Sequence, residues 1–214
     1  MQKIALIGDC QSLRIYDHWD FKSGIDMVAW GKSGDSAYKF DPNLRFINDE
    51  LSSPSEIYDK EKNQISFKKI KDEGIILMWL GYIDIKCFLP VHKNTKKVVS
   101  QYINKAQSYF KNSKLIFIEP FPQFIPYIGL KSEQSLKSSY EERKKYNDEF
   151  IQTLHNQFNG QIITQNHFFK ELGFDQNDMT YDVARKDDDK NFADTFDQKN
   201  MKKIYELILS KAIN

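Results

Sequence analysis

The sequence predicts a three-layer α/β/α fold with a doubly wound, mainly parallel sheet of about five strands. Two observations carry this prediction. Short runs of continuously apolar residues recur along the chain, as expected for strands that are covered on both faces. Segments with apolar residues at helical spacing separate these runs. This alternation is typical of parallel strands joined by right-handed helical crossovers.

The expected strands are defined by apolar runs that stop at glycine, proline or polar residues. The run Ile-Ile-Leu-Met-Trp-Leu, for example, ends at Gly81, and Leu-Ile-Phe-Ile ends at Glu119 and Pro120. We expect the first four strands to end at one edge of the sheet. The five expected strands are residues 3–7, 26–30, 75–80, 115–118 and 161–164.

Helices are expected where apolar residues follow a helical period. One such helix begins directly after Gly8-Asp9-Cys10, and the others cover residues 98–110, 140–158 and 200–213. Two long irregular stretches, residues 38–66 and 173–196, remain between these elements. Irregular stretches of that length in a compact domain are usually functional or mobile loops.

The composition is that of one ordinary globular domain over residues 1–214. The chain is 40% hydrophobic and 29% charged, and 31 basic residues against 30 acidic ones leave a formal net charge of +1. We therefore expect no nucleic-acid partner and no membrane partner. Two cysteines are too few for a disulfide scaffold, and the first residues lack a signal-peptide core. The expected location is the cytoplasm.

Three of the expected strands end in glycine beside polar residues. They are followed by Gly8-Asp9-Cys10, by a segment that starts at Gly31, and by Gly81-Tyr82-Ile83-Asp84. Ligands of open parallel sheets bind beyond the carboxyl ends of the strands. Glycine lets backbone N–H groups approach a ligand closely, and such groups can form an oxyanion hole.

Cys10 is the candidate nucleophile at this edge. A cysteine at the start of a helix is favoured in its thiolate form by the helix dipole and by free backbone N–H groups. The alternative is a cysteine that packs behind the first strand, because free cysteines are often buried. The second cysteine, Cys87, is interpreted as a core residue, and the alternative is a reversible disulfide with Cys10.

These strand ends resemble the sequence blocks of the SGNH (GDSL) hydrolase superfamily, in the same order along nearly the whole chain. The resemblance places Cys10 at the position of the nucleophilic serine and Gly31 in the second block. Gly81 begins the third block, and residues 194–197, Asp-Thr-Phe-Asp, take the place of the family's Asp-x-x-His. It implies an SGNH hydrolase-like fold, with Asp194 orienting the catalytic base.

The chain departs from the family pattern at two important positions. Ile83 replaces the third-block asparagine, which removes a side-chain donor to the oxyanion, and Asp197 replaces the histidine. A carboxylate is a poor base for a serine, but a preformed thiolate needs less help. Another histidine is the alternative base: His167 is the candidate because it follows the fifth strand, and His92, which follows the third block in a loop that contains Pro90, is a second one. The remaining histidines are His18 and His155, of which His155 is interpreted as a surface residue.

We therefore expect an SGNH-like esterase or acyltransferase that acts on an O-acyl ester through Cys10. Asp9, Gly31, Gly81 and Asp84 are the expected substrate-binding residues, and no cofactor or metal is expected. The Gly8-Asp9-Cys10-Gln11 block is similar to that of capsular-polysaccharide acyltransferase-like proteins, which favours a small-molecule or carbohydrate acyl ester as partner. The alternative is a catalytically degenerate SGNH-like protein with a binding or structural role, and the oligomeric state is left open.

Overall fold

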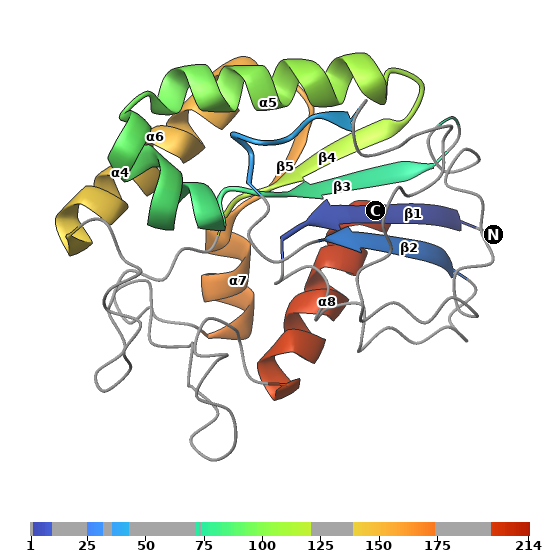
Figure 1. Cartoon of the computed structure of the whole chain (residues 1–214). Helices are drawn as coiled ribbons and strands as arrows, with labels where there is room; N and C mark the ends of the chain where they lie inside the picture. The colour runs from blue at the N-terminus through green and yellow to red at the C-terminus, as the bar shows by residue number, and fades with distance from the viewer. Residues whose placement is uncertain are drawn as a thin grey trace.

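One parallel sheet organises the chain. The computed structural model describes residues 2–9, 25–31, 36–42, 72, 74–120, 139–173 and 198–214. Its five strands follow the order β2-β1-β3-β4-β5, and all neighbours run parallel (Figure 1). Each strand matches its expected range to within one residue at either end. The strands are β1 (Gln2–Gly8), β2 (Ile25–Gly31), β3 (Ile75–Trp79), β4 (Lys114–Ile118) and β5 (Gln161–Ile163).

Helices cover both faces of this sheet, which confirms the predicted three layers. Helices α5 (Thr95–Tyr109) and α6 (Tyr140–Gln157) lie on one side, and α8 (Gln198–Ile213) lies on the other (Figure 1). Successive residues of one strand point to opposite faces, yet Leu6 and Ile7 are both fully buried. This double burial explains why the strands are continuously apolar.

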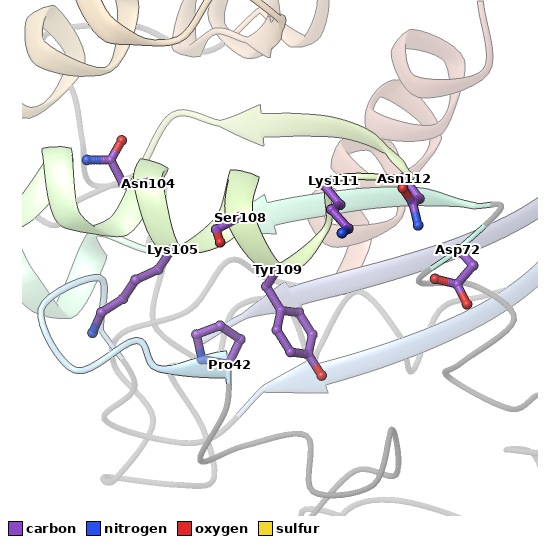
Figure 2. Close-up of a pocket in the computed structure, with 8 residues that line it drawn as sticks. All are labelled: Pro42, Asp72, Asn104, Lys105, Ser108, Tyr109, Lys111 and Asn112. Atoms are coloured by element: carbon purple, nitrogen blue, oxygen red, sulfur yellow. The ribbon is translucent and has the colours of Figure 1, made fainter.

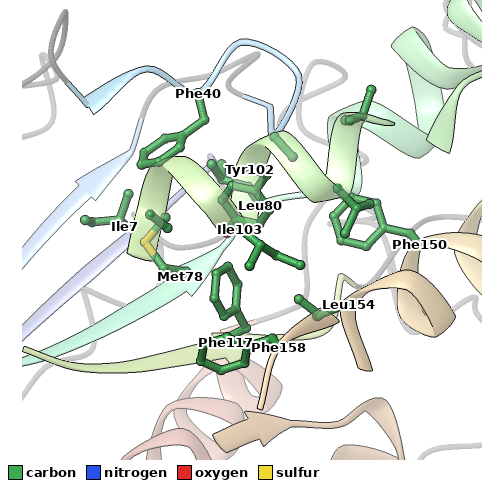
Figure 3. Packing of buried hydrophobic residues seen from close by; sticks show 14 of the residues in the cluster. Ile7, Phe40, Met78, Leu80, Tyr102, Ile103, Phe117, Phe150, Leu154 and Phe158 are labelled. Atoms are coloured by element: carbon green, nitrogen blue, oxygen red, sulfur yellow. The ribbon is translucent and has the colours of Figure 1, made fainter. Parts of the chain in front are cut away.

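The core between the sheet and α5 and α6 is rich in aromatic side chains (Figure 3). The Tyr102 ring meets Phe40 and Phe117 edge-on, at centroid distances of 5.5 and 5.1 Å. Phe117 in turn meets Phe158 at 4.6 Å. Edge-to-face geometry is a favourable arrangement for aromatic rings. These contacts hold α5 and the end of α6 against β4.

Two helical segments were not expected. The segment of Pro90 and His92, expected to be a loop after the third block, forms the short helix α4 (Leu89–His92), which continues from the π-helix η2 (Asp84–Phe88). That prediction was wrong because a proline in the first turn of a helix sacrifices no intrahelical hydrogen bond. The short helix α7 (Gln165–Leu172) follows β5 and ends at Gly173, whose φ is +71°.

Several predictions concern residues that the structure does not describe. The helix expected after Cys10 lies outside the described ranges, as do most of the irregular stretches at 38–66 and 173–196. Within the described part of the chain, no helix combines the length and apolar character needed to cross a bilayer. The extent of a single domain over residues 1–214 stays a prediction.

Candidate functional site

The three glycine-containing strand ends lie at one edge of the sheet. Gly8, at the end of β1, is the register partner of Gly31 in β2 and of Trp79 in β3. The strand order places the topological switch between β1 and β3, where ligands of doubly wound sheets bind. Gly31 and Gly81 therefore lie at the same edge of the sheet as Gly8. Cys10, Asp194 and Asp197 lie outside the described residues, so their places at this edge stay predictions.

Gly81 has a backbone conformation that only glycine adopts readily. Its φ is +130°, and its carbonyl accepts the N–H of Ile85 at 3.0 Å as the chain turns into η2. A Cβ atom at this position would lie 2.9 Å from Cζ of Phe150 and 3.0 Å from Cβ of Pro120. The glycine thus serves both the turn and the close approach of α6 and of Pro120 to the chain just after β3.

Asp84 holds the segment that follows the second block. Its side chain is fully buried, and its two carboxylate oxygens accept the N–H groups of Ala37 at 2.6 Å and of Tyr38 at 2.8 Å. Bonds from backbone N–H groups to an ionised carboxylate are stronger than neutral ones. Asp84 therefore links the second and third blocks; its predicted contact with substrate stays a prediction.

The buried Tyr102 lies within electrostatic range of two of the predicted site carboxylates. Burial raises the pKa of Tyr102 well above its usual value; the Leu80 backbone acts in the opposite direction, and the negative charges of Asp84 and Asp9 raise the pKa further. Asp9 is itself buried, at 2% exposure. Asp9, which follows β1, and Asp84, which begins η2, thus both act electrostatically on the Tyr102 hydroxyl.

His167 lies in the first turn of α7, just after β5, and is half-buried. Its Nδ1 accepts the backbone N–H of Thr164 at 3.2 Å and lies 3.1 Å from the Thr164 hydroxyl oxygen. An imidazole that accepts a hydrogen bond at Nδ1 carries its proton at Nε2 when neutral. In this arrangement Nε2 is a donor and Nδ1 is occupied. His167 can therefore act as a base only if the hydrogen bond between Thr164 and Nδ1 is broken.

The other histidines have different surroundings. His92 ends α4, and the Tyr38 ring stacks on it at a centroid distance of 4.6 Å. His155 has 43% of its side chain exposed, as expected of a surface residue, but its Nε2 lies 2.6 Å from a carboxylate oxygen of the buried Glu119. His18 lies outside the described residues.

Glu119 is the polar residue at this edge that the sequence analysis treated only as the end of a strand. Besides His155, its carboxylate accepts the N–H of Gln165, the first residue of α7, at 2.6 Å. The Gln165 side chain donates to the carbonyl of Pro120 and, at 3.1 Å, to Oδ1 of Asn147. The sequence signal that could have identified Glu119 is a charged residue directly after a buried strand. Glu119 ties β4 to α6 and to the start of α7.

No metal-binding cluster is found among the described residues, where no group of three or more His, Cys, Asp or Glu side chains converges. Cys87 lies in η2, but its side chain is not among those described, so its interpretation as a core residue stays a prediction.

Comparison with solved structures identifies the class of fold. The chain is similar over 99% of its length to 96% of a psychrotrophic esterase, EstA from Pseudoalteromonas, with a TM-score of 0.52 and 15% identity. A lipase/acylhydrolase from Enterococcus faecalis matches 98% of the chain over 94% of its own length, with a TM-score of 0.52 and 14% identity. A GDSL-like lipase from Bacteroides thetaiotaomicron matches 98% of the chain over 86% of its own length, with a TM-score of 0.52 and 12% identity.

No protein-family model matches the sequence, and comparison with curated proteins finds no match. The likeness to the three structures is thus one of fold. The chain has the SGNH hydrolase-like fold, as its sequence blocks predicted.

Proposed function

We propose that this protein is an SGNH-type esterase or acyltransferase that acts on an O-acyl ester through Cys10. The observation that carries the proposal is that the glycine-containing blocks lie together at the carboxyl edge of β1, β2 and β3. Cys10 follows Gly8, the last residue of β1, by two positions in the sequence. The esterase, the lipase/acylhydrolase and the GDSL-like lipase of similar fold support the same class of reaction.

The proposed reaction has two steps. The Cys10 thiolate attacks the acyl carbon, and backbone N–H groups of Cys10 and Gly31, with Gly81 nearby, stabilise the resulting oxyanion. The intermediate collapses as the ester C–O bond breaks, and the leaving alcohol takes up a proton. Water or an acceptor hydroxyl then attacks the thioester and loses its proton, which releases the acid or the new ester and restores the thiolate. Asp194 orients the catalytic base in this scheme, for which His167 is the candidate.

The proposed substrate is a carbohydrate O-acyl ester. The support is the first block, Gly8-Asp9-Cys10-Gln11, and its similarity to that of capsular-polysaccharide acyltransferase-like proteins. The proposal places the protein in the cytoplasm.

A second candidate function is a binding or structural role without turnover. The observation that favours it is the bond from Thr164 to Nδ1 of His167, which occupies the accepting nitrogen of the candidate base. Replacement of the family's histidine by Asp197 and of its asparagine by Ile83 favours it as well.

A hydrolysis assay separates the two functions. Wild type, Cys10→Ala and Cys10→Ser are assayed on p-nitrophenyl acyl esters and on O-acetylated sugars, with Cys87→Ala as the matched thiol control. The proposal expects turnover that Cys10→Ala abolishes and Cys87→Ala retains. Turnover unchanged by Cys10→Ala contradicts the nucleophile. Absence of turnover and of transfer to sugar acceptors supports the second function.

A further inference from the structure

A hollow of about 590 Å³ lies on the side of the molecule where β3 and β4 begin, away from the candidate site (Figure 2). Asn104 and Ser108 of α5 line it, together with Asn112, which precedes β4, and Asp72, which precedes β3. Its volume is within the range of small-molecule pockets. The function proposed above makes no use of this hollow.

The polar side chains of the hollow have unused hydrogen-bonding capacity. Within the described ranges, Asn104, Ser108 and Asn112 make no side-chain hydrogen bond. Two amides and a hydroxyl together supply both donors and acceptors. A ligand with several hydroxyl groups, each both a donor and an acceptor, fits this mixture.

An aromatic side chain lies among these polar groups. Tyr109 projects from α5 beside Pro42 (Figure 2). The Tyr109 ring is half-buried and is held edge-on by Phe110 at a centroid distance of 5.0 Å. A tyrosine combines an apolar ring with a polar tip, and it suits a ligand that has an apolar face and a hydroxylated rim.

The charges of the hollow nearly cancel. Lys105 lies 3.8 Å from a carboxylate oxygen of Asp41 and donates to the Phe40 carbonyl at 2.9 Å, so its charge is already compensated. Lys111 and Asp72 add one charge of each sign, and neither forms an ion pair within the described ranges. A neutral ligand is therefore favoured over an anion or a cation.

We propose that this hollow is a binding site for a neutral sugar unit of a glycan. The ring of Tyr109 supports the C–H face of the sugar, and the amide of Asn112 binds its hydroxyls. The proposal does not rest on the proposed function, because the hollow lies at the opposite end of the strands from Gly8 and Gly81 and is tested by binding alone.

The test is a titration of the isotope-labelled full chain followed by NMR. The probes are the neutral trisaccharides cellotriose and maltotriose, with trigalacturonate as the anionic counterpart. We expect at least one neutral trisaccharide to bind with a dissociation constant of about 1 mM or tighter. The backbone amides of Lys111 and Asn112 should shift, and trigalacturonate should bind at least about tenfold more weakly.

Variants localise the binding. Ser108→Trp fills the hollow from an exposed helix position, and Asn112→Ala removes one amide without adding bulk. Both should weaken binding at least about tenfold. The matched control Gln107→Ala, an exposed neighbour on α5 that does not line the hollow, should bind as wild type does. The proposal is overturned if neither neutral probe binds, if trigalacturonate binds more tightly, or if Asn112→Ala leaves binding unchanged.

Discussion

The carboxylate of Asp84 and the backbone of Ala37 meet at 2.6 Å although they are 47 residues apart in the sequence. The same carboxylate also accepts the N–H of Tyr38. The Tyr38 ring stacks on the Phe88 ring of η2 at a centroid distance of 5.6 Å. The ammonium group of Lys39 lies 4.6 Å from the centre of the Phe88 ring. Residues 36–40, which follow the second block, are thus attached to the helix that follows the third block.

Replacing Asp84 by asparagine should reduce the free energy of unfolding by about 3 kcal/mol. The amide keeps the shape, but its NH₂ group faces one of the two backbone donors, so one charge-assisted bond is lost and a buried donor is left unpaired. Urea unfolding measures the change. The control is Asp148→Asn, which removes an exposed partner of Lys144 at 3.0 Å and should cost no more than about 0.5 kcal/mol. Equal losses of unfolding free energy in the two variants would contradict a larger stabilising role for the buried carboxylate than for the exposed one.

Gly81→Ala should destabilise the protein by about 3 kcal/mol or more, because the new methyl group adds overpacking to backbone strain. Gly173→Ala is the matched control: it also has a positive φ, but a Cβ there meets nothing within 4 Å. Its cost should be limited to about 1–2 kcal/mol. In a double-mutant cycle, Gly81→Ala should cost less stability in a Phe150→Leu background than in wild type. The cost of Gly173→Ala should be the same in both backgrounds.

Glu119→Gln should reduce stability by about 2 kcal/mol, because hydrogen bonds to a charged group are stronger than those to a neutral one. Glutamine retains one acceptor for the N–H of Gln165 and presents its NH₂ group near His155. The start of α7 should loosen first, so amide hydrogen exchange should accelerate at Gln165 and His167. Acceleration that is uniform over the whole protein would contradict a local role for Glu119.

The ion pair between Glu171 and Lys211 predicts a pH dependence. Its nitrogen–oxygen distance is 2.7 Å, and it joins α7 to α8. The hydrogen bond from Lys211 lowers the pKa of Glu171 below its ordinary value of 4.5, and the positive charge of Lys211 acts in the same direction. A lowered folded-state pKa means that the contribution to stability is present above the unfolded-state pKa and is lost as the pH falls through the folded-state pKa.

Thermal unfolding of wild type and Glu171→Gln should therefore show a small difference in Tm at neutral pH. This difference should disappear towards about pH 3. Lys211→Met should behave in the same way, since it removes the other partner. A difference that persists in acid would assign the effect to packing rather than to charge.

The strands could be predicted from the sequence because each one is a local signal. An apolar run ending in glycine, such as the one before Gly81, needs no distant partner to be recognised. The same holds for α6, whose capping box between Ser139 and Glu142 spans one turn. Even here Pro90 misled, because its effect depends on whether it falls in the first turn of a helix or in its interior.

The contacts that shape the candidate site could not be predicted in this way. Glu119 and His155 are 36 residues apart, and each alone resembles an ordinary surface residue in the sequence. The role of His167 depends on a tautomer, which is set by the N–H of Thr164 and not by residue type. Residue type and spacing identify which groups are present at an edge; which of them already have partners is decided by tertiary packing.

The reactivity of Cys10 tests whether the proposed site is active. A thiolate favoured by a helix start should react with iodoacetamide at pH 7 faster than a free model thiol, because the thiolate is the reacting form. The carboxylates of Asp9 and Asp197 would oppose this if they lie close, since a neighbouring negative charge disfavours a second one. Asp197→Asn should then accelerate alkylation, and Asp197→His should accelerate it further by supplying the cation that the family pattern has at this position. Rates are measured by mass spectrometry on the Cys87→Ala background, so that Cys10 is the only thiol. A wild-type rate no greater than that of the free thiol, unchanged by both substitutions, would favour the binding or structural role over catalysis.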